Sequence, residues 1–229
     1  MTDTTPEACA AAYRELRERV TVLLRGVDPT ALDATASATP EWRARDVLAH
    51  VVGVNTDIVN QNLDGVASDE WTAAQVARRR DASIDDLLDE WAEHASVVEA
   101  NVAFLGKAAG QWVFDACTHE HDLRNALGVP GARDARAVAI SYAWGTDRLG
   151  ERLDRHGIAG LELTTDDGEK AIGAIEPRDG VRTGRFELVR AMTGRRSTTQ
   201  MAAYDWKGTP RPGDLVLDIF VARSTDFLD

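Results

Sequence analysis

The segment QWVFDACTHEHDLRNALG, residues 111–128, decides the fold class of this chain. It contains neither proline nor glycine until Gly128 closes it, and Pro130 follows two residues later. A glycine just past the last turn with a proline shortly beyond it is typical of a helix C-terminus. At helical spacing, the side expected to face the core consists of Trp112, Asp115, Ala116, His119, Leu123 and Ala126. The segment therefore predicts a helix that carries a carboxylate and an imidazole one turn apart on its apolar side.

Three earlier segments have the same amphipathic period. The first covers residues 6–25, and the second starts at residue 40 or 46 and runs towards residue 65. The third covers residues 84–105, where Ser83 and Asp86 have the spacing of a capping box. Four helices of this length, joined by loops that contain turn residues, predict an antiparallel four-helix bundle.

The second half of the chain changes from helical periodicity to alternation. One more helix is expected over residues 134–156, and Gly157 follows it. Residues 160–165 alternate and then reach Asp166-Asp167-Gly168, which is a hairpin signal. The returning strand is expected over residues 171–175.

Three more elements complete the expected C-terminal region, namely helices near residues 186–192 and 198–204 and a final strand over residues 215–221. The change of pattern places the domain boundary near Gly157. The predicted fold class is therefore mainly α, with a helical bundle over residues 1–156 and a small α+β domain over residues 157–229.

Composition limits the possible classes of function. The chain has 229 residues, of which 44% are apolar, and this is enough to bury a substantial core. Its net charge of −12 would repel a nucleic-acid backbone. The first residues lack a secretory pattern, and no apolar run is long enough to span a bilayer. We expect a cytoplasmic protein with no nucleic-acid or membrane partner, in which Cys9 and Cys117 are small buried side chains.

Polar residues on buried helix faces indicate a metal site. Asp115 and His119 lie on the apolar side of their helix, and His50 lies in the turn of Val47 and Val51 on another helix. A buried carboxylate is costly unless it is paired or bound to a metal. Three ligand-type side chains from two facing helices leave an open position, as in catalytic zinc sites. A second interpretation stays open, namely a core histidine bonded to a carbonyl beside a simple i,i+4 pair.

Three groups of motifs resemble one known family. The first is Thr39-Pro40-Glu41-Trp42 followed by Arg45-Asp46-Val47-Leu48-Ala49-His50. The second is Trp112-Val113-Phe114-Asp115 with His119, Asp122-Leu123-Arg124 and Ala126-Leu127-Gly128. The third is Glu187-Leu188-Val189-Arg190 with Thr193-Gly194-Arg195-Arg196-Ser197. In this order, over nearly the whole chain, they resemble the mycothiol-dependent maleylpyruvate isomerase family of actinobacteria, within the wider DinB-like metalloenzymes.

The resemblance implies both a fold and a set of site residues. It implies a DinB-like four-helix bundle followed by a small domain similar to sterol-carrier folds. It makes His50, Asp115 and His119 the metal ligands, although the family usually has a glutamate at the position of Asp115. It also suggests that Arg195 or Arg196 faces the metal cleft and binds a substrate carboxylate, for which the guanidinium fork is well suited.

The function implied is that of an enzyme with a divalent metal, zinc by expectation, and mycothiol as co-substrate. Such a metal acidifies a thiol that enters its open position. The thiolate would isomerise a small, maleylpyruvate-like electrophile by adding to its cis double bond and leaving again, or would be transferred to another electrophile. Two alternatives stay open: a metal-dependent hydrolase that uses bound hydroxide, and a non-catalytic module that binds a metal or an apolar ligand.

Other polar residues have structural interpretations. His121 lies two residues past a candidate ligand, roughly 200° around the helix, and is expected on the surface. Glu120 and His94 are expected in solvent. Asp122 is expected on the inner edge, where it orients a ligating histidine or arginine or makes an ordinary intrahelical bond. The run Arg78-Arg79-Arg80 is expected to be a solvated loop face.

Overall fold

The structure, a computed structural model, describes residues 2–229 and divides into two compact units. The N-terminal unit comprises residues 3–131 and the C-terminal unit residues 132–228. The division differs from the expected domains, residues 1–156 and 157–229, by one helix. This helix, α6 (Arg136–Arg155), packs against elements of the C-terminal unit.

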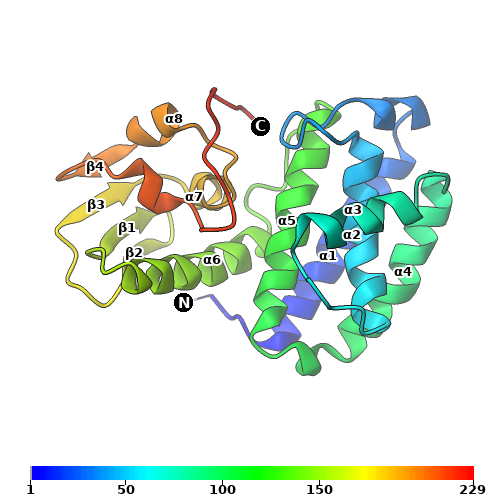
Figure 1. Cartoon of the computed structure of the whole chain (residues 1–229), viewed down its shortest axis with the longest axis horizontal. Coiled ribbons are helices and arrows are strands. Elements are labelled where there is room, and N and C mark those ends of the chain that lie inside the picture. Colours follow the sequence, from blue (N-terminus) through cyan, green and yellow to red (C-terminus); the bar gives the residue numbers. More distant parts are fainter. Residues whose placement is uncertain (1) are drawn as a thin grey trace. The chain divides into compact units, whose positions relative to one another are not determined.

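Over residues 3–131, four long helices form a bundle and a short helix packs on it. The long helices are α1 (Pro6–Arg25), α2 (Ala44–Val59), α4 (Ile84–Ala100) and α5 (Ala108–Ala126). The shorter elements are the 3-10 helices η1 (Pro29–Asp33) and η2 (Val102–Leu105) and the helix α3 (Asp69–Arg78). Both α1 and α2 contact α4 and α5, and α3 packs on α2 (Figure 1). The predicted bundle is confirmed, whereas α3 was not predicted.

Local capping explains where the bundle helices begin. The Thr5 hydroxyl caps α1, and Ser83 and Asp86 form the predicted capping box of α4. At α2, the Asp46 carboxylate accepts a hydrogen bond from the backbone N–H of Arg43 at 2.9 Å. The helix therefore starts near the later of its two predicted positions.

A buried polar hub joins the four long helices. We use the term aromatic hub for Tyr13, Asn55, Trp91 and Trp112, one residue from each of these helices. The Tyr13 and Trp112 rings stack with centroids 3.6 Å apart. The Asn55 amide donates to the Tyr13 hydroxyl at 2.6 Å and accepts from Trp112 Nε1 at 3.1 Å. Trp91 Nε1 donates to the Tyr13 hydroxyl at 3.0 Å, so these polar groups are bonded within the core.

Both cysteines are buried, as predicted. Cys9 lies on α1 and Cys117 on α5. Burial raises the pKa of the Cys9 thiol to about 11, and the charges of Asp3 and Glu7 add to the effect. The Cys9 thiol is therefore protonated at neutral pH, which agrees with a packing role.

Over residues 132–228, helices pack with a four-stranded sheet. The helical elements are α6, α7 (Arg185–Met192), α8 (Thr198–Ala202) and the 3-10 helix η3 (Pro212–Leu215). The strands are β1 (Leu161–Thr165), β2 (Gly168–Ile172), β3 (Asp179–Arg182) and β4 (Asp205–Lys207). Their order is β2-β1-β3-β4, with β1 parallel to β3 and the other pairs antiparallel (Figure 1). The predicted class, mainly α with a small α+β region, is confirmed.

One expected strand is wrong, and two strands were missed. Residues 215–221 form no strand in the described chain: Leu215 ends η3, and the Leu217 amide donates to the Met192 carbonyl at 3.1 Å. The short strands β3 and β4 were not predicted. The returning strand of the hairpin starts at Gly168, three residues earlier than expected, because the turn is only two residues long.

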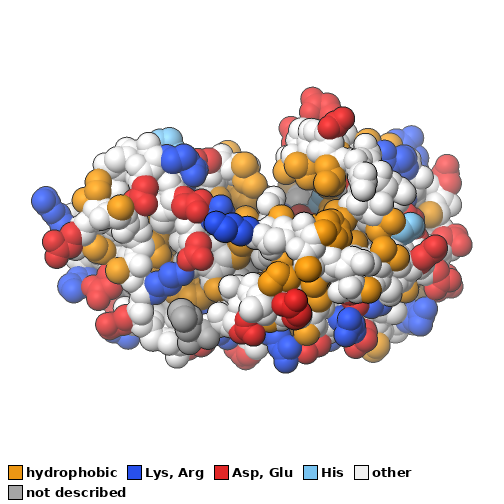
Figure 2. Space-filling view, turned by 90° about the horizontal axis from the view of Figure 1, so that it is seen from below, with side chains coloured by type: hydrophobic (Ala, Val, Ile, Leu, Met, Phe, Trp, Pro, Cys, Tyr) orange, Lys and Arg blue, Asp and Glu red, His pale blue; other side chains and the backbone are white. Residues whose placement is uncertain are grey.

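Charged side chains of both signs cover the surface. On the face shown in Figure 2, Asp and Glu side chains are interspersed with Lys and Arg. Ion pairs account for part of this pattern; Asp218, for example, accepts hydrogen bonds from Arg152 and Arg155. Over the described residues 2–229, we find no helix with the length and apolar character needed to cross a membrane.

Candidate metal centre

Three side chains that could hold a metal ion meet between α2 and α5. His50 comes from α2, and Asp115 and His119 lie one turn apart on α5. Asp115 Oδ1 is 3.5 Å from His50 Nε2 and 3.7 Å from His119 Nε2. One ligand-type atom of each residue lies within 4.8 Å of the other two. The structure thus brings together the three residues that the sequence analysis singled out, which we call the His-Asp-His cluster.

The two histidines of the cluster are buried, whereas the aspartate is partly open. His50 and His119 are 5% and 8% exposed, and the Asp115 side chain is 33% exposed. The imidazole rings lie edge to face with centroids 4.9 Å apart. Trp42, from the loop before α2, packs against both imidazoles at centroid distances of 5.4 and 6.2 Å. Of the three side chains of the cluster, that of Asp115 is therefore the most exposed.

His119 is oriented by a carboxylate on its own helix. Its Nδ1 atom is 3.1 Å from Asp122 Oδ2, and Asp122 is fully buried. An ionised carboxylate only accepts hydrogen bonds, so Nδ1 carries the proton and Nε2 keeps a free electron pair. Burial lowers the pKa of the His119 imidazole, although the bond to Asp122 and the charge of Asp115 oppose this shift. The neutral, metal-binding form of His119 is thereby favoured.

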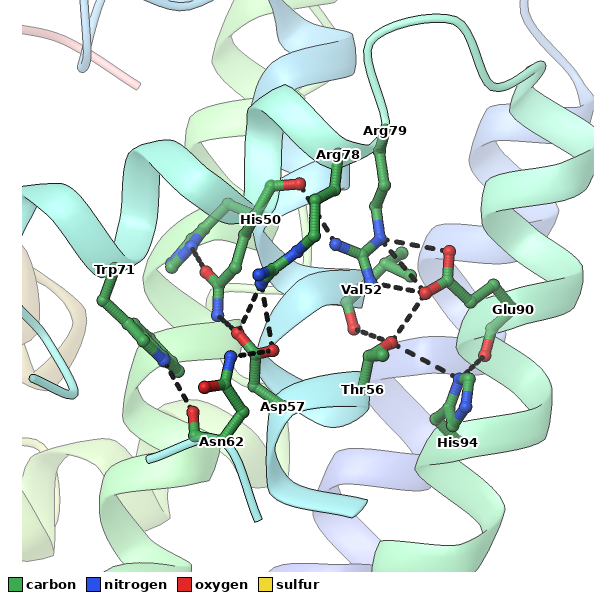
Figure 3. Close-up of polar contacts among 11 residues, drawn as sticks. His50, Val52, Thr56, Asp57, Asn62, Trp71, Arg78, Arg79, Glu90 and His94 are labelled. Carbon is green, nitrogen blue, oxygen red and sulfur yellow. Dashed lines mark hydrogen bonds and ion pairs between the residues drawn. The ribbon is translucent and has the colours of Figure 1, made fainter. Parts of the chain in front are cut away.

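His50 is oriented by a residue from α3. Its Nδ1 atom is 2.7 Å from Oε1 of Gln75, which is completely buried (Figure 3). Gln75 was not among the residues that the sequence indicated. Both imidazoles of the cluster are therefore bound through Nδ1 to side-chain oxygens, and both present Nε2 to Asp115.

This set of donors fits a divalent metal with an open coordination position. Two imidazole nitrogens and one carboxylate oxygen form the ligand set of several catalytic zinc sites. In a tetrahedral site with metal-to-ligand distances of about 2.0 to 2.1 Å, neighbouring ligand atoms are roughly 3.3 Å apart. The distances of 3.5 and 3.7 Å from the nitrogens to Asp115 Oδ1 are close to that value.

Comparison with known proteins places the chain in a family. The family model described as the mycothiol maleylpyruvate isomerase N-terminal domain matches residues 13–128. This match covers just over half of the chain and includes the whole His-Asp-His cluster. The chain belongs to the mycothiol maleylpyruvate isomerase family. The resemblance found in the sequence motifs is thereby confirmed.

One solved structure is similar to this family member over a longer part of the chain than the bundle. It is the crystal structure of a histidine-to-alanine mutant of the mycothiol-dependent maleylpyruvate isomerase. The TM-score is 0.54 with 15% sequence identity, over 83% of this chain and 89% of that chain. At this identity the likeness supports the fold alone. Among curated proteins, the search found no match.

The two candidate arginines of this family member follow α7 in the C-terminal unit, and both are buried. Arg196 donates from Nε and Nη2 to the two carboxylate oxygens of Glu187, at 2.6 and 2.8 Å. Arg195 donates from Nη1 to the Thr193 carbonyl at 2.7 Å, and its guanidinium lies 5.8 Å from the Phe220 ring. Glu187 therefore engages the fork of Arg196, while Arg195 binds the backbone of its own unit.

Two residues of α5 that were expected at the surface or in solvent are buried instead. His121 and Glu120 are both almost completely covered. Glu120 accepts hydrogen bonds from Arg19 at 3.2 and 2.8 Å and from Arg124 at 3.1 Å. His94, also expected in solvent, is half-buried. His121 was expected to be exposed because it lies roughly 200° around the helix from a candidate ligand. In the structure, however, α5 is buried around most of its circumference.

The run of three arginines at the end of α3 was expected to be a solvated loop face, and this is wrong for Arg79. Arg78 binds the Asp57 carboxylate, with Nη2 at 3.0 Å from each oxygen. Arg79 is buried and binds the Glu90 carboxylate through Nε, at 3.0 and 3.2 Å, and through Nη2. Arg78 and Arg80 are exposed, as expected, although Arg78 is also ion-paired. Two arginines therefore attach α3 to α2 and α4 (Figure 3).

We expect Glu90→Gln to reduce the acid sensitivity of the bundle. Burial alone would raise the pKa of Glu90, but hydrogen bonds from Arg79 and Thr56 outweigh it and hold the pKa below its usual value. A lowered carboxylate pKa stabilises the fold above the unfolded-state value of about 4.3, and this contribution is lost as the pH falls through the folded-state value. The variant should therefore be less stable by about 1 to 3 kcal/mol at neutral pH.

Urea unfolding at a series of pH values measures this effect. The difference in unfolding free energy between wild type and Glu90→Gln should be largest near neutral pH and shrink towards zero below about pH 4. Glu93→Gln, on the exposed side of the same helix, is the matched control and should change stability little at any pH. A difference that stays constant from neutral to acid pH would contradict the assignment.

Proposed function

We propose that this chain is a divalent-metal enzyme that uses mycothiol to isomerise a small, maleylpyruvate-like electrophile or to transfer the thiol to it. The observation that carries the proposal is the His-Asp-His cluster, with two buried imidazoles that each present Nε2 to one carboxylate. Membership of the mycothiol maleylpyruvate isomerase family supports the thiol and the class of substrate. Zinc is the metal that this ligand set favours.

The cluster residues prepare the site for a thiol. His50 and His119 are neutral donors, and Asp115 contributes the one negative charge. A divalent ion bound there supplies the positive charge that lowers the pKa of a thiol at the remaining position. Because the three side chains carry a single negative charge, they compensate only part of that positive charge. The partly exposed Asp115 marks the side from which small molecules reach the cluster.

The added thiol, rather than a protein side chain, is the nucleophile of the proposed reaction. Its sulfur bonds to one carbon of an activated cis double bond, and the π electrons move to the conjugated carbonyl oxygen. The former double bond is now single and rotates. Expulsion of the sulfur restores the double bond in the trans geometry and releases the thiol unchanged, so the reaction needs no oxidant or reductant. In a transfer reaction, a proton adds to the carbanionic carbon and the carbon–sulfur bond remains.

A substrate carboxylate requires a cationic partner, and we propose Arg195 or Arg196 for this role. A guanidinium binds a carboxylate through two parallel hydrogen bonds, which fixes orientation as well as charge. In the structure, Arg196 binds the Glu187 carboxylate and Arg195 binds the Thr193 carbonyl. The role belongs to substrate binding, so neither arginine is needed to hold the metal or the thiol.

Turnover of maleylpyruvate by the zinc-loaded full chain, with and without mycothiol, tests the proposal. We expect isomerisation only when mycothiol is present. Arg195→Ala or Arg196→Ala should raise KM for maleylpyruvate, while calorimetric titration shows mycothiol binding unchanged. Turnover that is independent of thiol would support a hydrolase instead. Absence of both thiol binding and turnover would support a non-catalytic binding module.

A further inference from the structure

A series of hydrogen-bonded polar side chains connects the His-Asp-His cluster to a residue of α3 and, through it, to a second residue of α2. Gln75 accepts from His50 Nδ1 at 2.7 Å and donates from Nε2 to Asp57 Oδ2 at 2.8 Å. Asp57 also accepts hydrogen bonds from Arg78 at 3.0 Å and from Asn62 at 2.9 Å. Figure 3 labels His50, Asp57, Asn62 and Arg78, which lie around this row of contacts. We call Gln75 and Asp57 the His50 relay; both are buried, as is His50 itself.

The carboxylate of Asp57 determines which atom donates and which accepts in each hydrogen bond of the His50 relay. An ionised carboxylate can only accept hydrogen bonds, so the part of the Gln75 amide that faces Asp57 must be its NH2 group. The amide oxygen is thereby turned towards His50. Because an amide oxygen also only accepts, Nδ1 of His50 must carry the proton. Nε2, 3.5 Å from Asp115 Oδ1, is left as the unprotonated, metal-binding nitrogen.

Gly53 permits the close approach of α3 to α2 on which the relay depends. A Cβ atom at position 53 would lie 2.6 Å from Cβ and 2.7 Å from Cγ of Gln75, which is too close for any side chain. Glycine inside a helix costs roughly 0.5 to 1 kcal/mol relative to alanine. Gly53 lies less than one turn after His50 in α2, and the absence of a side chain there allows Gln75 to reach the imidazole.

We propose that Gln75, held by Asp57, is a positioning residue that fixes the tautomer and orientation of His50 and so sets the metal affinity of the cluster. The proposal rests on the metal-binding part of the proposed function and not on its thiol chemistry. Asp122 orients His119 from within α5, whereas His50 depends on a separate helix. The role of α3, which lies outside the four long helices, is thus to complete the support of the cluster.

Nitrogen NMR of the metal-free full chain tests the tautomer directly. With the imidazoles neutral, long-range proton–nitrogen spectra are expected to show His50 protonated at Nδ1. Gln75→Leu removes both hydrogen-bonding groups at similar size, so His50 should shift towards the Nε2-protonated form. Glu93→Gln, an exposed substitution on α4 away from the relay, should leave the tautomer unchanged. The same His50 tautomer in wild type and Gln75→Leu would overturn the proposal.

Titration with Zn²⁺ against a chromophoric chelator measures the consequence for metal binding. Loss of a partner that orients a metal ligand typically weakens binding by 10-fold to 100-fold, and we expect Gln75→Leu to fall within about this range. Glu93→Gln should bind Zn²⁺ as wild type does, because its side chain is exposed on α4. Equal affinities of wild type and Gln75→Leu would contradict the proposed role.

A double substitution separates positioning from packing. Asp57→Asn alone allows the two amides to face each other in either direction, so the tautomer of His50 is no longer fixed. Combined with Gln75→Glu, the new amide donates to the new carboxylate, whose other oxygen accepts from His50 Nδ1. We expect the double variant to regain the Nδ1-protonated tautomer and most of the Zn²⁺ affinity. A folded double variant that binds as weakly as Gln75→Leu would overturn the proposal.

Failure of this inference is distinguishable from failure of the proposed function. If wild type binds no Zn²⁺, the metal-dependent function is wrong, while the metal-free NMR result still decides whether Gln75 sets the His50 tautomer. If wild type binds Zn²⁺ and Gln75→Leu changes neither tautomer nor affinity, the proposed function stands and the relay does not.

Discussion

His119→Ala is expected to lower the affinity of the full chain for Zn²⁺ by more than about 100-fold, since losing only the partner of a ligand can cost up to that much. The substitution removes one of the three donors of the cluster. It also leaves the fully buried Asp122 without the imidazole that it contacts at 3.1 Å. His50→Ala and Asp115→Ala should have comparable effects, because each removes one donor from a three-donor site.

Metal analysis after dialysis, together with Zn²⁺ competition titrations, measures this loss. His121→Ala is the matched control, because it removes a buried histidine from the same helix that is not part of the cluster. It should lose stability through packing but keep its metal. Zinc retained in all three ligand variants, or lost from His121→Ala, would show that the ligands are assigned wrongly.

The cluster could be located from the sequence because its signal is local. Asp115 and His119 lie one turn apart on a stripe that is otherwise apolar, and the helix around them has a clear C-terminal stop at Gly128. His50 falls within a similarly apolar turn of α2. Periodicity alone therefore placed all three side chains on faces that the fold directs inward.

The support of the cluster could not be located in this way because it is non-local. Gln75 reaches His50 from 25 residues away, and its helix α3 has only 10 residues. A start signal was present, since Ser68 caps α3 and two acidic residues follow it. Glu120 shows the same limitation, because its partner Arg19 is 101 residues away on α1. Helical angles indicate where a side chain points but not which distant residue meets it.

The C-terminal unit shows why short strands escape sequence analysis. Strand β4 has only three residues and β3 has four, too few for alternation to be distinguished from a loop. The strand expected over residues 215–221 is the opposite error, because a strand was predicted where none forms. Leu215, at the end of the 3-10 helix η3, and Val216 and Leu217, which follow it, are all buried. Apolar character alone does not separate such a segment from a strand.

The aromatic hub connects the stability of the bundle to the geometry of the cluster. Asn55 lies on α2 with His50, and Trp112 lies on α5 one turn before Asp115. The hydrogen bond from Trp112 Nε1 to the Asn55 amide oxygen therefore joins the two helices that carry the cluster. A fully bonded buried polar group also fixes the register of the helices, because sliding one past the other would leave donors without acceptors.

We expect Trp112→Ala to lower the free energy of unfolding by about 3 to 5 kcal/mol, the usual cost of truncating a buried tryptophan. The variant loses the stack on Tyr13 and the hydrogen bond to Asn55 together. Trp112→Phe keeps an aromatic ring against Tyr13 and removes only the indole N–H, so it should cost about 1 to 3 kcal/mol.

Urea unfolding followed by circular dichroism compares the two variants without relying on the fluorescence of the altered tryptophan. If the hub sets the register of α2 and α5, Trp112→Phe should also weaken Zn²⁺ binding, because Asn55 then loses the bond that joins the two helices. Trp206→Phe, which removes an indole donor in the C-terminal unit, should leave Zn²⁺ binding unchanged. A Trp112→Ala variant within 1 kcal/mol of wild type would contradict a structural role for the hub, since packed aromatic cores do not tolerate such truncation.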